Sequence, residues 1–238
     1  MRAPRLVRAP MRWCACILFC LVLIPAERAV GAEEVSGVRP LQHLSLSAFL
    51  ATLPPHIQVL HEAAAMESFL AALDGTPPDW SAMYGHGHHD PGHDDRLFSL
   101  NRARDAEREG NPVLQTPLAF VWSGELSRLD PDTGGYSVAL GPVFTPTAWG
   151  QVRFKPVDLP GELLVVPGVA CARHIRHVLE QGKPLEIAVV FIGRLVPEES
   201  LVYDFSHDQE GLGLIMPFVR VEQVHYLWEQ PAGCEASQ

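Results

Sequence analysis

The chain has 238 residues, of which 47% are hydrophobic and 19% are charged, and its formal net charge is −10. An acidic chain is poorly suited to bind phosphate backbones or anionic lipid, because both need positive surface. Nucleic acid is therefore excluded from the expected partners.

The first 32 residues have the features of a secretory signal peptide. Four arginines precede an apolar run at residues 14–26, which is too short for a comfortable membrane span. Small residues at 30–32 offer a cleavage site, so we expect a periplasmic or extracellular protein that has no membrane contact after cleavage. A retained N-terminal anchor is the alternative. Without residues 1–32, 13 Lys+Arg stand against 27 Asp+Glu, a net charge of −14.

Two of the five cysteines, Cys171 and Cys234, lie outside the predicted signal peptide. In an oxidising compartment they predict one disulfide. A loop of roughly sixty residues would be stabilised by about 4 kcal/mol on a chain-entropy model. Two unpaired thiols are the alternative.

Residues 33–112 are predicted to form a helical extension. Apolar residues at helical spacing predict helices at 47–53 and 56–73, and Asp79 is placed to cap a short helix ending at Tyr84. A charged helix follows at 96–109, with Asp94 or Asp95 as its N-cap. We place the domain boundary near residue 112, where the composition changes.

Residues 113–230 are predicted to form a β domain, followed by a short tail at 231–238. Alternating or β-branched runs predict strands, and a helix is expected at 169–181. The strands fall at 114–127, 136–140, 149–154, 185–196 and 216–228, and residues 162–166 either continue the third strand or form their own. This β-β-β-α-β-β order is typical of a small OB-like β-barrel, which with the extension gives an α+β fold. A β-sandwich with one helix is the alternative.

Residues 84–95, "YGHGHHDPGHDD", form a candidate metal site. Imidazole and carboxylate groups are ligands of zinc, nickel and copper. The candidate ligands are His86, His88, His89, His93, Asp90 and Asp94. Two other interpretations stay open: a hydrophilic connector, or a packed loop whose aspartates cap the next helix.

A weaker metal site is formed by Asp204, His207 and Asp208 in the connection predicted between the fourth and fifth strands. In an OB-fold, that loop and the first hairpin loop, here 130–135, flank the binding face. Two acidic loops there favour a cation or a basic partner. Ordinary turn chemistry accounts for the same residues.

Two further groups of side chains have structural interpretations. Phe144, Trp149 and Phe154 could form a stacking platform, but the acidic charge of the domain favours barrel core. His174, His177 and Glu180 share one helix face, which we interpret as solvated.

The sequence contains no G-x-S-x-G, H-E-x-x-H, P-loop or EF-hand motif, so no catalytic residue is assigned. We expect an exported, non-enzymatic binding or accessory protein whose partner is an unknown protein or small ligand. A zinc-, nickel- or copper-binding protein that uses the 86–95 cluster is one alternative. A metal-dependent hydrolase is another.

Overall fold

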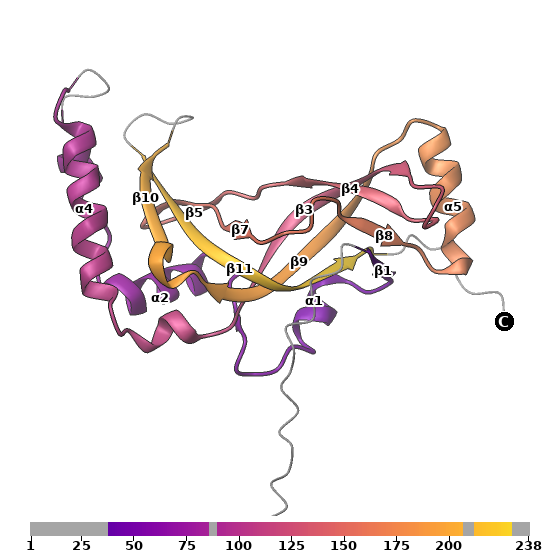
Figure 1. Ribbon diagram of the computed structural model, residues 1–238, viewed down its shortest axis with the longest axis horizontal. Helices are drawn as coiled ribbons and strands as arrows, with labels where there is room; N and C mark the ends of the chain where they lie inside the picture. Colours follow the sequence, from indigo (N-terminus) through magenta and orange to yellow (C-terminus); the bar gives the residue numbers. More distant parts are fainter. Residues whose placement is uncertain (1–37, 86–89, 207–211, 230–238) are drawn as a thin grey trace, which may run out of the picture. The chain divides into compact units, whose positions relative to one another are not determined.

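A computed structural model describes residues 38–85, 90–206 and 212–229 (Figure 1). Residues 33–238 form one compact unit, and all the described residues belong to it. The predicted signal peptide lies outside them.

Six strands close into a β-barrel, and helices accompany it (Figure 1). The predicted small barrel and the predicted mixture of helices and strands are thereby confirmed. Around the barrel they run in the order β1-β8-β4-β3-β9-β11, and β11 returns to β1. Only β1 makes parallel pairs within this ring; the other four pairings are antiparallel. The strands are β1 (Val38–Gln42), β3 (Leu118–Leu129), β4 (Tyr136–Gly141), β8 (Leu164–Val166), β9 (Leu185–Leu195) and β11 (Gly213–Leu227).

Strand β1 was not predicted. It lies between β8 and β11, with Arg39 opposite Val165 and Leu41 opposite Tyr226. Five residues that include Pro40 carry little strand signal, and only Leu41 is fully buried. The segment assigned to a helical extension therefore contributes a strand to the barrel wall.

The barrel core follows from period-two alternation on the long strands. Along β3, Phe120, Trp122 and Leu126 point inward, while Ser123 and Glu125 are exposed. The Phe120 ring stacks on Phe154 at 4.6 Å and on Phe191 at 5.1 Å.

In the part of the chain that the structure describes, five short strands extend the sheet outside the ring. The predicted third strand is split: Gly150–Val152 becomes β6, outside the ring, while β8 is a separate barrel strand. Pro156 and Pro160 lie between residues 154 and 162, and neither has the N–H that a continuous ladder would need. The others are β2 (Gln58–Val59), β5 (Thr145–Thr147), β7 (Lys155–Val157) and β10 (Leu201–Phe205).

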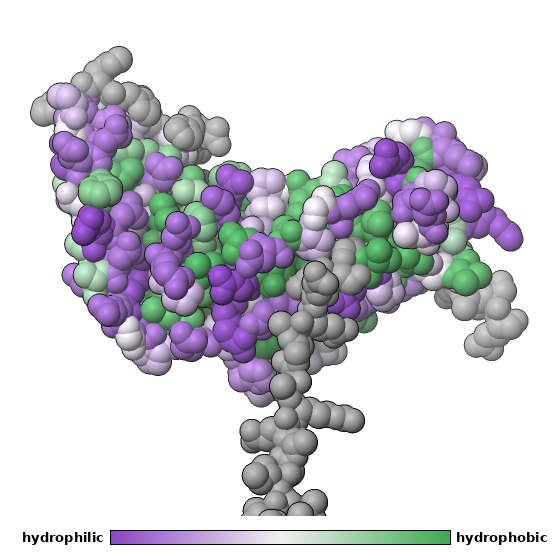
Figure 2. Space-filling view, in the orientation of Figure 1, coloured by the Kyte–Doolittle hydropathy of each residue, from purple (hydrophilic) through white to green (hydrophobic). Residues whose placement is uncertain are grey.

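The helices pack around the barrel. Helix α1 (Leu46–Leu50) places Phe49 on the outer face of the barrel, against Val190, Ile192 and Leu227. In Figure 2 hydrophilic side chains cover most of the visible surface of α4 and α5. No helix in the described ranges combines the length and apolar composition needed to cross a bilayer. The remaining helices are α2 (Ala63–Asp74), α3 (Trp80–Tyr84), α4 (His93–Arg108), α5 (Val169–Glu180) and the 3-10 turns Pro112–Gln115 and Pro197–Glu199.

Two helix predictions are confirmed and two need correction. Asp79 caps α3 by accepting a hydrogen bond from the Ala82 N–H at 3.0 Å. Helix α5 lies in the chain between β8 and β9, as expected for residues 169–181. The helix expected at 56–73 begins only at Ala63, and residues 58–59 form β2 instead. Helix α4 begins at His93 with Gly92 as its N-cap, so Asp94 and Asp95 lie in the first turn and are not caps. Negative charges in the first turn still interact favourably with the positive N-terminal end of the helix dipole.

Candidate functional site

One edge of β3 is interrupted. Strand β2 pairs with it at Leu118 and Ala119, and β4 pairs with it from Ser123 onward. Neither of these strands pairs with residues 120–122, whereas β9 pairs along the other edge without a break. The barrel wall therefore has a gap between the end of β2 and the end of β4.

The local sequence explains both borders of this gap. Pro142 directly follows β4, and its ring fixes φ at about −65°, whereas an antiparallel strand needs about −140°, so the ladder does not continue toward Trp122. On the other side the Leu60 N–H donates to the Ala119 carbonyl at 2.7 Å, and the chain then turns into α2.

The backbone of Val121 faces the gap. Backbone N–H and C=O groups point to alternate edges along a strand. Ala119 accepts a hydrogen bond on the β2 side, and Ser123 pairs with Gly141 on the same edge. Val121 lies two residues from each, so its donor and acceptor point into the gap.

A cavity of about 250 Å³ opens at this gap. Most of the described side chains around it are apolar, and His61 is the one ionisable side chain among these described residues. The lining residues are Leu60, His61, Met66, Val121, Trp122, Ser123, Val143, Thr145, Phe154, Ile187 and Ala188. The gap and the cavity together form the candidate site. Sequence reasoning missed them.

Trp122, in the cavity wall, is only 7% exposed, and its indole Nε1 has no hydrogen-bond partner among the described residues. An unsatisfied buried donor costs about 1–3 kcal/mol. A hydrogen-bond acceptor brought to this N–H would recover part of that cost.

The predicted metal site falls largely outside the described residues, which do not include His86, His88, His89, His207 or Asp208. Within the described ranges no group of three or more His, Cys, Asp or Glu could hold a metal ion. Binding of zinc, nickel or copper stays a prediction.

The described part of the 84–95 stretch packs locally. The Asp90 carboxylate accepts a hydrogen bond from the Arg96 guanidinium at 2.9 Å. The His93 ring has Nδ1 at 2.7 Å from the Asp90 carbonyl and Nε2 at 3.1 Å from Asp94, and its centroid is 5.3 Å from that of Phe205. These contacts favour a packed loop for the C-terminal part of the stretch, although its aspartates do not cap α4 as that interpretation expected.

Of the two acidic loops, the structure describes residues 130–135 and Asp204, while residues 207–211 lie outside the described residues. Asp204 lies in β10, where its Oδ1 accepts from the Phe205 N–H at 2.8 Å. In the 130–135 turn, the hydroxyl of Thr133 and the Asp132 N–H donate to Asp130, and these hydrogen bonds lower the pKa of Asp130. The first hairpin loop thus shows ordinary turn chemistry.

The structure also shows where the predicted aromatic cluster, the histidines of α5 and Cys171 lie. Trp149 and Phe154 are buried in the core as expected, while Phe144 is 43% exposed beside Arg153. The histidines of α5 are exposed. Cys171 is buried, with its Sγ 3.9 Å from His43 Nδ1. Because Cys234 lies outside the described residues, the disulfide stays a prediction.

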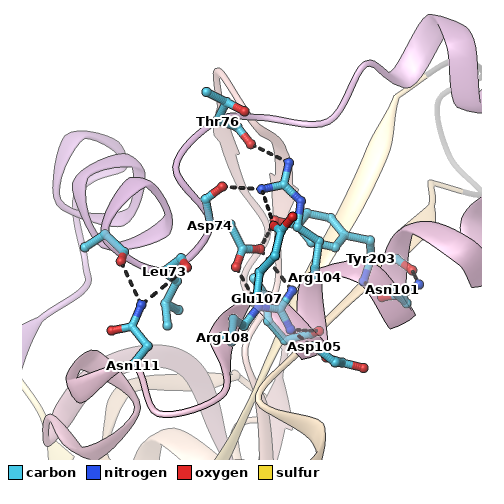
Figure 3. A network of polar contacts seen from close by, with 12 residues as sticks. Leu73, Asp74, Thr76, Asn101, Arg104, Asp105, Glu107, Arg108, Asn111 and Tyr203 are labelled. Carbon is cyan, nitrogen blue, oxygen red and sulfur yellow. Dashed lines mark hydrogen bonds and ion pairs between the residues drawn. The ribbon is translucent and has the colours of Figure 1, made fainter.

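A buried polar network, which the sequence analysis also missed, joins α2, α4 and β10 (Figure 3). The Arg108 guanidinium donates to both carboxylate oxygens of Asp74, at 2.6 and 2.9 Å, and to the Leu201 carbonyl at 3.0 Å. The Tyr203 hydroxyl donates to Asp74 Oδ2 at 2.5 Å. Asn101 exchanges two 2.8 Å hydrogen bonds with the backbone of Tyr203.

The network keeps Arg108 charged. Burial acts to lower the pKa of Arg108, but its hydrogen bond to Asp74 and the charge of Asp74 outweigh burial, so the pKa is raised. Arg108 is 1% exposed and Tyr203 is 1% exposed. We interpret this group as a structural joint, because its polar atoms face one another and leave little surface to a reactant.

Two buried tyrosines allow a matched test of that joint. Replacing Tyr203 by Phe removes the hydrogen bond to Asp74 and should cost about 1.5–3 kcal/mol, since the acceptor is charged. Tyr226 is 0% exposed and its hydroxyl has no partner among the described residues. Tyr226→Phe should therefore change stability by less than about 1 kcal/mol. Urea unfolding of both variants measures the difference, and equal costs would contradict it.

The same hydroxyls make stability depend on alkaline pH. Burial raises the pKa of Tyr226 to about 12, against an opposing effect of Arg39. Burial and Asp74 raise the pKa of Tyr203 as well. Because the pKa of each hydroxyl is higher in the folded state, its contribution to the free energy of unfolding is complete below about pH 10. This contribution is lost as the pH rises toward 12. Each Phe variant should show a smaller alkaline loss than the parent protein.

Comparison with known proteins identified no relative: no family model, no curated protein and no solved structure matches the chain.

Proposed function

We propose that this chain is an exported, non-enzymatic binding or accessory protein with an OB-like barrel, and that it binds its ligand at the gap beside β3. The feature that carries the proposal is the largely apolar cavity at a break in the barrel wall. Export rests on the signal-like features of residues 1–32.

The OB-like assignment is supported by the order of five barrel strands along the chain. These are β3, β4, β8, β9 and β11, with α5 between the third and the fourth. A closed barrel with a helix at that point agrees with this fold family. Strand β1, inserted between β8 and β11, is the departure from it. None of the described residues that line the cavity comes from the 130–135 hairpin loop, so the fold does not determine the ligand.

Ligand binding is supported by the chemistry of the cavity. Apolar cavities of about 150 Å³ are large enough to bind benzene. Here the described lining residues offer one imidazole, from His61, and two hydroxyls, from Ser123 and Thr145. The Ser123 hydroxyl donates to the Gly141 carbonyl at 3.1 Å, so it is already committed to the strand pair. The site is better equipped for binding than for acid–base chemistry.

The test uses toluene as a neutral apolar probe, followed by ligand-observed NMR on the purified protein. Val143 lies among the cavity lining, between β4 and β5, and is 41% exposed, whereas Leu129 ends β3 outside the cavity and is 40% exposed. Val143→Trp should fill the cavity and reduce toluene binding at least tenfold. Leu129→Trp, which places the same indole ring at nearly equal exposure, should leave it unchanged. Absence of saturable toluene binding by the parent protein, or equal loss in both variants, would refute the proposal.

A further inference from the structure

We propose that the natural occupant of this site is an extended polypeptide segment, which pairs its backbone with Val121 and places one apolar side chain in the cavity. This inference rests on the proposed function and names the class of ligand. A partner protein in the same compartment would supply the segment.

The backbone of Val121 carries the first step. It turns one donor and one acceptor into the gap, between two places where β3 is already paired with other strands. Extended peptides complement such an edge, because each second residue presents one N–H and one C=O at the matching spacing. An apolar ligand without an amide would leave both groups of Val121 unmatched.

The length of the gap carries the second step. From Ala119 to Ser123 the strand advances four residues, about 13 Å at 3.3 Å per residue. β2 and β4 border this interval, so there is room for about three residues and not for a long added strand. The cavity is also smaller than the roughly 300 Å³ at which drug-sized pockets begin, which suits a single side chain.

The charges beside the site carry the third step. Glu125 and Glu186 are exposed and lie directly opposite each other on β3 and β9. Like charges in this position are destabilising, and within the described ranges neither carboxylate has an ion-pair partner. Glu125 lies on the outer face with Ser123, about 7 Å along the strand, whereas the cavity residue Trp122 points inward. When the apolar residue of the segment points inward beside Trp122, the residue next to it points to the outer face, where a basic side chain would relieve the repulsion.

The probe is therefore the capped tripeptide acetyl-Lys-Leu-Lys-amide, titrated into the purified ¹⁵N-labelled protein. We expect saturable shifts of the Val121 amide and of the Trp122 indole N–H. N-methylation of the leucine removes the peptide donor for the Val121 carbonyl and should weaken binding at least tenfold. Replacing the leucine by alanine empties the cavity and should weaken it similarly. Val143→Trp should abolish the shifts, and Leu129→Trp should preserve them.

Each failure has a distinct meaning. If toluene binds but the tripeptide does not shift Val121, or if the N-methylated peptide binds as well as its parent, the polypeptide assignment is wrong and the cavity remains a ligand site. If neither toluene nor any of the peptides binds, the proposed function itself is wrong.

Discussion

Replacing Arg108 by alanine should destabilise the protein by about 3–5 kcal/mol, because it leaves the Asp74 carboxylate buried without its counter-ion. Asp74 is 7% exposed, and the guanidinium meets both of its oxygens. Arg108 also donates to Asp105 and to the Leu201 carbonyl, so the loss extends to α4 and β10. Urea unfolding of the purified variant measures the free energy directly.

A second variant separates the unpaired charge from the lost packing. The double replacement Asp74→Asn and Arg108→Met removes both charges and keeps most of the volume. It should be more stable than Arg108→Ala, because no isolated charge remains in the interior. If the double variant were equally unstable, the cost would come from packing and not from the ion pair.

Replacing Gly193 by alanine should also be severe, costing about 3 kcal/mol or more, which lies at or beyond the upper end for overpacking. A Cβ at this position would collide with the backbone carbonyl of Arg220 on the neighbouring strand. Gly193 lies beside the bulge of β11, where the register shifts between Val221 and Gln223. Backbone atoms cannot rotate aside as a flexible side chain can, so the two central strands would have to separate.

Gly161 provides the control for that replacement. Its φ is not in the left-handed region, and a Cβ there would meet nothing within 4 Å. Gly161→Ala should change the free energy of unfolding by less than about 1 kcal/mol. A mild effect of Gly193→Ala would mean that β9 and β11 can move apart at the bulge.

The sequence predicted the parts of the fold that carry their own periodicity. Long runs such as residues 185–196 and 216–228 alternate or are β-branched, and they became the central strands β9 and β11. Short strands carry too few residues for a period to be recognised, which explains why β1 and β10 were missed. The sequence left open whether residues 162–166 form a separate strand. Their pairing with β1 and β4, which lie far away in the sequence, decides that they do.

The candidate site could not be predicted for a different reason. Val121 lies within an ordinary strand sequence, and nothing near it indicates that one edge stays unpaired. The gap arises because Pro142 ends β4 on one side and the turn into α2 ends β2 on the other. The polar network at Asp74 had a local signal in the sequence that the sequence analysis missed. Asn101, Arg104 and Arg108 recur at helical spacing on α4, and this polar stripe faces inward.

The parallel pair between β1 and β11 has a consequence for how the chain folds. Leu41 and Tyr226 are partners although 185 residues separate them in the sequence. The ring cannot close until nearly the whole chain has been synthesised, and contacts of such long range slow folding. Until then the edges of β8 and β11 remain open to pairing with other chains. Pairing of β1 with β8 and β11 covers both edges and thus ends the period in which the chain is most prone to aggregate.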